Sequence, residues 1–321
     1  MNCCLRTDCR FLRVAKEAGL TERGISLKQK RKTLKTKKYL NITVQAASAD
    51  LTDQAQAIAT QLGLSIEPPE CSVHSIRSTE QNNRLLLRVS SNGLELLQPD
   101  DPKCSGAVRV DFTAGRAAFR RKQQKKELLV RAVEGKGGGI NNASLKIIDA
   151  TGGLGRDSFL LAAAGHQVCI FECQPVIAAL LADGLARAGT HPETAKIAQR
   201  IRLIAKNAVN ALEAVEAVEA GGQEGQGVDV VYLDPMFPER RKSALVKKEL
   251  QLLQLLAHLD SAPEQLLTAA LQVATHRVVV KRPVKAPFLA DCAPSHSLSG
   301  KTVRFDVYLG GLLNRNRKKS G

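Results

Sequence analysis

The sequence predicts an α/β protein whose main part is a Rossmann-like, mostly parallel sheet that ends in an antiparallel C-terminal pair of strands. From Ile147 onward, short apolar runs alternate with amphipathic segments of helical length, which is typical of parallel strands covered by helices on both faces. Beyond Pro283 this alternation stops, and two strand-like runs flank a turn at Gly300. A small N-terminal α/β domain and a disordered basic extension are predicted in front of this sheet.

The first 40 residues are strongly basic and show little apolar periodicity. They hold 12 lysines and arginines against 3 acidic residues, and they include the run LKQKRKTLKTKK. A segment of this composition cannot bury enough apolar surface to offset the entropy cost of folding. We therefore predict that residues 1–40 form a disordered extension. A basic targeting peptide is the alternative, and the acidic residues count against it.

Residues 41–114 are predicted to form the small α/β domain. The run NITVQAA is typical of a strand, and the helical pattern that follows it ends at Gly63. Two apolar runs then flank Asn92-Gly93, which is a strong short-range signal for a hairpin. The run AVRVDF predicts a further strand at 107–112.

Residues 115–140 are predicted to form a basic helix that leads into a glycine-rich linker. Residues 115–136 contain 8 lysines and arginines against 2 acidic residues, and the predicted basic tail 311–321 contains 4 against none. The remainder of the chain outside these segments and the N-terminal extension is nearly neutral. The charge is therefore gathered in patches of the kind that bind a phosphate backbone. Exposed solubilising charges are the alternative reading of the same residues.

The largest domain is predicted to span residues 141–310. Strands are expected at 147–150, 168–172, 201–205, 228–233 and 277–281, and helices at 156–165, 175–188, 207–220 and 243–257. A segment near Ser295–Leu298 and the run TVRFDVYL are expected to form the closing antiparallel pair.

Composition argues against membrane and secreted proteins. No apolar run approaches the roughly 18 residues of a membrane span, and the N-terminus lacks the apolar centre of a secretory signal peptide. The 8 cysteines form no CxxC pair, which predicts free thiols in a reducing, cytoplasmic compartment. No histidine or second pair accompanies Cys3, Cys4 and Cys9, so no metal site is expected.

A glycine-rich turn follows the first strand of the main sheet. Gly152, Gly153 and Gly155 let a ligand approach the backbone closely, and the helix beyond them presents free N–H groups. The spacing differs from the GxGxxG pattern of dinucleotide-binding proteins. Glu172 ends the next strand, 20 residues after Gly152, where an acid can accept hydrogen bonds from ribose hydroxyls. Together these residues predict an adenosine-type cofactor.

The fourth strand ends in the turn Asp234-Pro235-Met236-Phe237. Enzymes that methylate exocyclic amino groups have a similar turn at this place, whereas a nicotinamide enzyme has no need of one. Asp234 and the Pro235 carbonyl are expected to accept hydrogen bonds from the amino group of a flat base, while Phe237 stacks on its ring. The predicted cofactor is therefore S-adenosyl-L-methionine, and a nicotinamide oxidoreductase is an alternative.

Several longer stretches resemble the family of bacterial small-subunit rRNA guanine-N2-methyltransferases, of the RsmJ type. They are DATGGLGRD, LLADGLARA, VVYLDPMFPERRKSALVKKE, RVVVKRP and RFDVYLG, and the similarity extends over residues 41–310. The resemblance implies a class I methyltransferase fold. It also implies methyl transfer from S-adenosylmethionine to N2 of one guanosine near the 3′ end of 16S rRNA, with the small ribosomal subunit as partner.

The resemblance further implies a set of cofactor contacts, which fall on Arg156, Asp157, Glu172, Cys173, Asn207, Ala208 and Asp234. Cys173 stands where the family commonly has Arg, Asn207-Ala208 where it has a Ser pair, and TGGLG where TAGLG is common. The glycine-rich stretch after Arg120-Arg121 is replaced here by KQQKKE. We expect Cys173 and Ala208 to act only through backbone or packing contacts.

The expected acceptor is a flipped or looped-out guanosine, because a base in a duplex must first leave its stack. Phosphate contacts are expected from eight basic residues: Arg120, Arg121, Lys122, Arg240, Arg241, Lys242, Lys281 and Arg282. One alternative is an amino methyltransferase that acts on DNA adenine or on a protein glutamine. Another is an RNA-binding relative that has lost catalysis.

Overall fold

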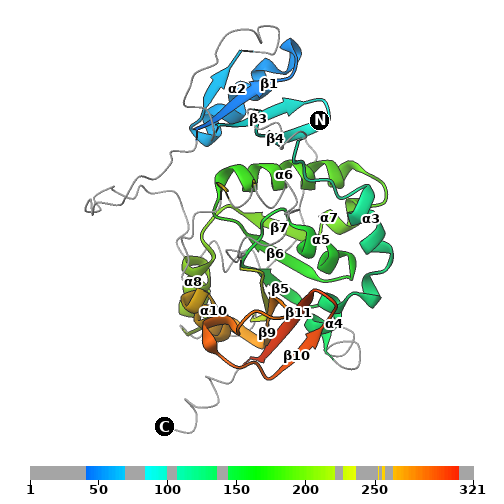
Figure 1. The fold of residues 1–321 in the computed structure, drawn as a ribbon, viewed down its shortest axis with the longest axis vertical. Coiled ribbons are helices and arrows are strands. Elements are labelled where there is room, and N and C mark those ends of the chain that lie inside the picture. Colours follow the sequence, from blue (N-terminus) through cyan, green and yellow to red (C-terminus); the bar gives the residue numbers. More distant parts are fainter. Residues whose placement is uncertain are drawn as a thin grey trace, which may run out of the picture.

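The computed structural model describes residues 41–68, 84–99, 107–135, 144–220, 227–235, 252, 255–256 and 263–310. The predicted extension 1–40, the predicted tail 311–321 and most of the predicted helix 243–257 lie outside these ranges. The described residues form a small sheet and a larger sheet, both with helices packed on them (Figure 1).

The small sheet has four strands in the order β2-β1-β3-β4. Its strands are β1 (Asn41–Ala46), β2 (Ser65–Glu67), β3 (Arg84–Ser90) and β4 (Gly93–Leu97). β1 pairs in parallel with β2 and β3, whereas β3 and β4 form the predicted antiparallel hairpin at Asn92-Gly93. Helix α2 (Thr52–Leu62) packs on this sheet and ends at Gly63, which adopts the left-handed conformation that often ends helices.

The segment 107–112 does not form the predicted strand. Only Val108 pairs with the sheet, through a single bridge to Leu96. Its alternate residues Val108, Val110 and Phe112 are buried all the same, and the Phe112 ring stacks on Phe159 with centroids 4.2 Å apart. The apolar alternation therefore reflects packing against the helices of the larger sheet rather than backbone pairing.

The basic stretch after residue 114 forms two helices instead of the single predicted one. Helix α3 (Gly115–Lys122) is followed by the 3-10 turn η4 (Gln124–Lys126) and by helix α4 (Leu128–Glu134). α3 buries no residue, whereas four of the seven residues of α4 are buried. The break lets the apolar part turn into the core while the basic part stays at the surface.

The larger sheet has seven strands in the order β10-β11-β9-β8-β5-β6-β7. Five of them are parallel, namely β5 (Lys146–Asp149), β6 (Gln167–Phe171), β7 (Ile201–Ile204), β8 (Val228–Leu233) and β9 (Ala274–Pro283). β11 (Val303–Leu309) pairs antiparallel with both β9 and β10 (His296–Ser299). The predicted fold class, a mostly parallel sheet with an antiparallel C-terminal pair, is confirmed.

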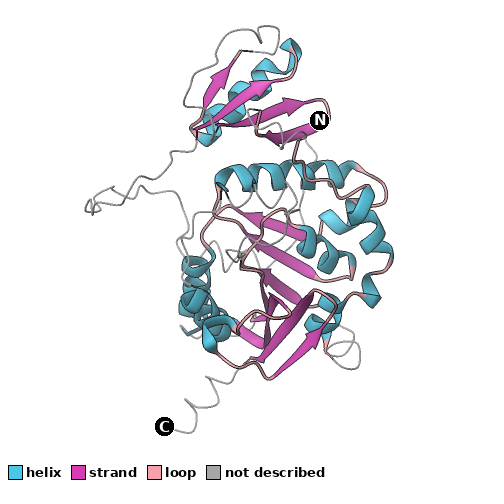
Figure 2. Ribbon diagram, in the orientation of Figure 1, coloured by secondary structure: helices cyan, strands magenta, loops and turns pink. Residues whose placement is uncertain are grey.

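Helices cover both faces of the larger sheet (Figure 2). One face packs against α4, α5 (Arg156–Ala163) and α6 (Pro175–Thr190), with the short α7 (Ala195–Ala198) beside α6, and the other against α8 (Ala208–Ala220) and α10 (Pro263–Val273). Successive strand residues alternate between the two cores, as Ile147 and Ile148 do. α7 and α10 were not predicted, although Pro263 at the first position of α10 is a common helix start.

Helix α6 lies between the two sheets and contacts both (Figure 1). Its Gly184 is so close to Val110 that an added Cβ would stand 2.4 Å from Val110 Cγ1. Arg187 of the same helix donates to the Val110 carbonyl at 2.5 Å and pairs with Asp183 at 2.7 Å. Together with segment 107–112, helix α6 thus fixes the small sheet to the larger one.

Within the described ranges, no helix is both long and apolar enough to cross a membrane. No group of three or more His, Cys, Asp or Glu side chains in these ranges is arranged to hold a metal ion. The described cysteines Cys169, Cys173 and Cys292 carry free thiols.

Candidate active site

The glycine-rich turn joins the carboxyl end of β5 to the start of α5 and packs tightly on β6. Gly152 N–H donates to the Phe171 carbonyl at 3.0 Å, and a Cβ on Gly152 would lie 2.5 Å from Ile170 Cγ2. Gly153 has a φ of +52°, and beyond its chain neighbours no atom lies closer than 3.8 Å to its Cβ position. Gly152 therefore allows close packing, and the positive φ of Gly153 lets the chain make the turn without a crowded side-chain position.

Glu172 directly follows β6 and holds the glycine turn in place. Its Oε2 accepts from Gly153 N–H at 2.7 Å, and its Oε1 accepts from Gln174 N–H at 2.8 Å. Burial raises the pKa of Glu172, and these hydrogen bonds to the carboxylate oppose the rise. The acid predicted to bind ribose hydroxyls thus also orders the turn beside which a cofactor would lie.

The end of β8 is hydrogen-bonded to the glycine turn. Asp234 N–H donates to Thr151 Oγ1 at 2.6 Å, and Thr151 N–H donates to Asp149 Oδ1 at 3.0 Å. Asp149 is buried at the end of β5, where its other oxygen accepts from the Ser158 hydroxyl. The Asp-Pro turn and the glycine turn are therefore one connected unit at the carboxyl edge of the sheet.

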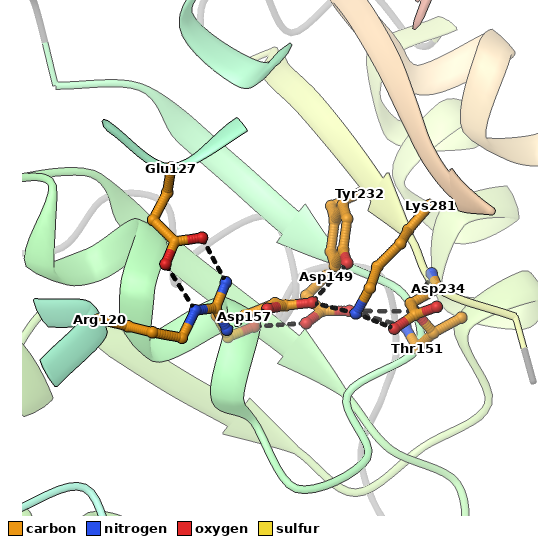
Figure 3. A network of polar contacts seen from close by, with 9 residues as sticks. Arg120, Glu127, Asp149, Thr151, Asp157, Tyr232, Asp234 and Lys281 are labelled. Carbon is orange, nitrogen blue, oxygen red and sulfur yellow. Dashed lines mark hydrogen bonds and ion pairs between the residues drawn. The ribbon is translucent and has the colours of Figure 1, made fainter. Parts of the chain in front are cut away.

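A lysine from β9 lies between two carboxylates at this edge (Figure 3). Lys281 Nζ is 2.7 Å from Asp157 Oδ2 and 2.8 Å from Asp234 Oδ2. The hydroxyl of Tyr232, which is buried in β8, donates to the same Asp157 oxygen at 2.8 Å. Because Asp157 lies in the first turn of α5, this cluster joins β8, β9 and α5 at a single point.

Arg120 extends the cluster to α3. Its guanidinium donates to Asp157 Oδ1 at 2.8 Å and to the two oxygens of Glu127 at 2.9 and 3.0 Å. Figure 3 shows the resulting row of side chains, which runs from Glu127 and Arg120 through Asp157 and Lys281 to Asp234. Charges alternate along the row, so each ion is stabilised by its neighbours, and the basic helix is connected to the Asp-Pro turn.

Burial and neighbouring charges set the protonation of these groups. Burial alone would raise the pKa of Asp157, but Lys281 and Arg120 hold it well below its usual range. Against the effect of burial, the carboxylates raise the pKa of Lys281. Burial raises the pKa of Asp149 to about 7. Burial also raises the pKa of Asp234, with Lys281 opposing, although 40% of this side chain is exposed.

Comparison with known proteins assigns this site to a family. Residues 71–310 match the family model described as "Putative SAM-dependent methyltransferase". The chain belongs to this methyltransferase family. The resemblance stated from the sequence is thereby confirmed, and the protein is an enzyme whose cofactor is S-adenosylmethionine.

Relatives of this methyltransferase extend over most of its length. It is 44% identical over 277 residues to ribosomal RNA small subunit methyltransferase J of Pseudomonas paraeruginosa, with 85% of this chain and 96% of that protein covered. A protein of the same name from Thioalkalivibrio sulfidiphilus is 41% identical, with 84% and 98% covered. The crystal structure of a SAM-dependent methyltransferase from Neisseria gonorrhoeae is 33% identical, has a TM-score of 0.60, and covers 83% of this chain and 95% of its own.

The carboxyl edge of the methyltransferase sheet carries groups that suit S-adenosylmethionine. The cofactor is cationic at its amino group and at its sulfonium sulfur, and Asp157, Glu172 and Asp234 bring carboxyl groups to this edge. The Cβ position of Gly153 meets only the Thr151 carbonyl oxygen, at 3.8 Å, and no side chain caps the N-terminus of α5.

The remaining residues of the predicted cofactor site lie along the same edge. Arg156 and Asp157 begin α5, and Cys173 is exposed after β6. Asn207 follows β7, and its side-chain oxygen accepts a 2.9 Å hydrogen bond from the first turn of α8, while Ala208 is buried. They gather because the carboxyl ends of neighbouring parallel strands lie at one edge. Their individual contacts with the cofactor stay predictions.

The residues of α3 that were predicted to bind RNA differ in their surroundings. Arg120 is held between Glu127 and Asp157. Arg121 pairs with Glu193, whereas Lys122 is exposed. Only Lys122 of these three therefore presents its charge fully to the solvent.

The two cations predicted at the end of β9 face opposite sides of the sheet. Lys281 enters the carboxylate cluster, but Arg282 is only 1% exposed and donates to the Pro287 carbonyl at 2.6 Å. The structure does not support the predicted phosphate contact of Arg282, because side chains alternate along a strand and this one points into the interior. The predicted residues Phe237, Arg240, Arg241 and Lys242 lie outside the described residues.

Four residues of the cluster were missed in the sequence-based prediction: Glu127, Asp149, Thr151 and Tyr232. Asp149 falls inside the predicted strand 147–150, and a charged residue at the end of a buried apolar run was an available signal. Tyr232 offered a similar signal, because a buried phenol needs a hydrogen-bond partner. Thr151 carried no such signal, since its role depends on how closely β8 approaches the glycine turn.

Proposed function

We propose that this methyltransferase transfers a methyl group to the exocyclic N2 of one guanosine near the 3′ end of 16S rRNA, in the small ribosomal subunit and in the cytoplasm. The names of its relatives support the rRNA of the small subunit as substrate. The observation that carries the proposal is the hydrogen bond from Asp234 N–H to Thr151 Oγ1. It holds the carboxylate of the Asp-Pro turn directly beside the glycine turn.

We assign the cofactor to the carboxyl edge of the larger sheet. The bound cofactor supplies an electrophilic methyl group on a sulfonium sulfur. The residues assigned to its site are Gly152, Gly153, Gly155, Arg156, Asp157, Glu172, Cys173, Asn207, Ala208 and Asp234. Among them, Glu172 keeps the turn in shape through its bond to Gly153 N–H, and the ionised Asp157 attracts a cationic group.

Asp234 and the Pro235 carbonyl orient the acceptor by accepting hydrogen bonds from the guanine amino group. N2 is a poor nucleophile because its lone pair is delocalised into the ring. The barrier is therefore lowered mainly by positioning and electrostatics rather than by a strong base. Lys281 opposes the effect of burial on the pKa of Asp234, and its ion pair limits the rotation of the carboxylate. The new N–C bond would replace the bond between the methyl group and the sulfonium sulfur, which keeps the electron pair, and the surplus proton leaves N2 for Asp234 or for solvent.

Substitution of Asp234 tests this assignment. Asp234→Asn keeps the shape and the backbone N–H of the residue but removes the charge that attracts the amino group. Methyl transfer is expected to fall roughly 10²- to 10³-fold, while binding of S-adenosylmethionine, measured by calorimetry, changes much less. Asp53→Asn, on an exposed part of α2, is the matched control and should leave both quantities unchanged.

The same assay separates the alternatives. An Asp234→Asn enzyme that methylates at the normal rate would refute the role given to this carboxylate. Transfer to DNA adenine or to a protein glutamine, and not to rRNA, would support the proposed methyl transfer to an amino group but refute rRNA as the substrate. Cofactor binding by the native enzyme without transfer to any acceptor would indicate an RNA-binding relative that has lost catalysis.

A further inference from the structure

Phe119 is the most exposed large hydrophobic side chain in the described part of the chain, at 62%. It lies in α3, whose sequence GRAAFRRK holds three arginines and one lysine and which buries no residue. A single exposed hydrophobic residue is ordinary on a protein surface. The position of this ring, in the middle of a basic helix beside the active site, is not explained by packing.

The cations of α3 divide between two sides of the helix. Arg120 pairs with Asp157 and Glu127, and Arg121 pairs with Glu193, so these two face the body of the protein. Arg116, Phe119 and Lys122 follow one another at intervals of three residues and are all exposed. They form the outer face of α3, which Lys125 and Lys126 of η4 extend as exposed cations.

The outer face of α3 has a fixed position relative to Asp234. Arg120, which follows Phe119 directly, reaches Asp157 at 2.8 Å, and Asp157 shares Lys281 with Asp234. The ion pairs of the inner side therefore hold α3 against the carboxyl edge of the sheet. A polynucleotide that delivers one nucleotide to Asp234 has its flanking nucleotides within reach of this helix.

We propose that the outer face of α3 is the docking surface for a single-stranded RNA segment next to the target nucleotide. Phe119 stacks on one unpaired base of that segment, and the cations around it contact the flanking phosphates. An exposed ring framed by cations is the combination that binds single strands, because every base has a face on which a ring can stack. The proposal rests on the proposed function, since it takes RNA to be the substrate.

Charge argues for RNA over the other partners that could cover this ring. Residues 1–40 of the same chain carry 12 basic against 3 acidic residues, so they are repelled by a cationic face. A second copy of the chain is nearly neutral outside its three basic segments, so it would offer no strongly anionic surface to this face. A phosphate backbone gains from every cation on the face and from the release of its counterions.

Substitutions at Phe119 distinguish stacking from general apolar packing. Phe119→Ala and Phe119→Leu are expected to raise the KM for small ribosomal subunits that lack the modification by about 5- to 150-fold. Phe119→Trp should keep the native KM, and kcat and the Kd for S-adenosylmethionine should stay unchanged in all three. Ile66→Ala, which alters another exposed apolar side chain, in β2, is the control and should change nothing.

Binding of a short, fluorescently labelled single-stranded RNA, measured without turnover, tests the docking surface independently of catalysis. Phe119→Ala should weaken it, and the double substitution Arg116→Gln/Lys122→Gln should lower the slope of log Kd against log salt by about 1 to 2. Native methyl transfer with unaltered RNA binding in Phe119→Ala would overturn the docking surface alone. Equal binding by the Leu and Trp variants would overturn stacking. If the native enzyme methylates no RNA, the proposed function fails, and this binding assay still decides the docking surface.

Discussion

Lys281 sets the charge balance of the active site, because its ammonium group lies 2.7 Å from Asp157 and 2.8 Å from Asp234. It lowers the pKa of both carboxyl groups. Without it, two carboxylates would face each other, and Asp234 would be protonated first because Asp157 keeps its ion pair with Arg120. A protonated Asp234 is a poor acceptor for an amino group, so ionisation of this residue should control the rate on the acid side.

Lys281→Met is therefore expected to move the acid limb of the pH–kcat profile upward by about 1 pH unit or more. Lys281→Arg retains the cation and should bring the limb back towards its native position. The measurement is the methyl-transfer rate at saturating substrates over a range of pH. A Met variant with reduced thermal stability but an unmoved acid limb would show that Lys281 is merely structural.

Asp149 should make folding stability depend on pH. Its pKa in the folded protein is about 7, above the ordinary value of 3.8. A raised pKa favours the folded state below the unfolded pKa, and this stabilisation is lost as the pH rises from about 4 to about 7. Asp149→Asn cannot titrate, so its free energy of unfolding relative to the native protein should rise over this range by up to roughly 4 kcal/mol. Urea unfolding at several pH values checks this, and a constant difference would contradict it.

Two elements, β9 and the pair α3 and α4, show what a local sequence pattern can and cannot predict about the structure. In β9, the alternation of side chains already implies that Lys281 and Arg282 cannot both face the site, so that error was avoidable. The break between α3 and α4 was not avoidable from local pattern, because both segments are good helix formers. It depends on Arg120 meeting Glu127 across the break, with α4 turned into the core.

Helix α6 offers an element-scale test with a matched pair of glycines. An added Cβ at Gly184 would stand 2.4 Å from Val110 Cγ1, whereas at Gly189 of the same helix it would meet nothing within 4 Å. Gly184→Ala is therefore expected to lower the free energy of unfolding by about 1–3 kcal/mol. Gly189→Ala should instead raise it by up to about 1 kcal/mol, because alanine favours the helix. Thermal unfolding measures both, and equal effects at the two positions would show that the α6–Val110 contact is loose.

At the scale of the whole molecule, the sequence predicts where the site forms, at one edge of the sheet. It predicts the contacts within the site less well. The glycine turn and Asp234 follow predicted strands and Glu172 ends one, and the parallel order brings the strand ends together. Arg120 reaches the site from 37 residues before Asp157, and no local pattern links the two. The row of alternating charges is thus a product of tertiary packing.

The cations of the protein serve two different purposes in this account. At the site, Lys281 and Arg120 are paired with carboxylates, whereas Arg116 and Lys122 are exposed on the outer face of α3. The paired cations stabilise the site itself, and the exposed ones suit a polyanion that has to be held beside it.

The most direct test of the central claim is transfer of a labelled methyl group to small ribosomal subunits from cells that lack this enzyme, with the product nucleoside mapped by mass spectrometry. The native enzyme should place the label as N2-methylguanosine at one site near the 3′ end of 16S rRNA, and Asp234→Asn should place almost none. Label on another atom or at another site, or no label despite bound S-adenosylmethionine, would contradict the claim.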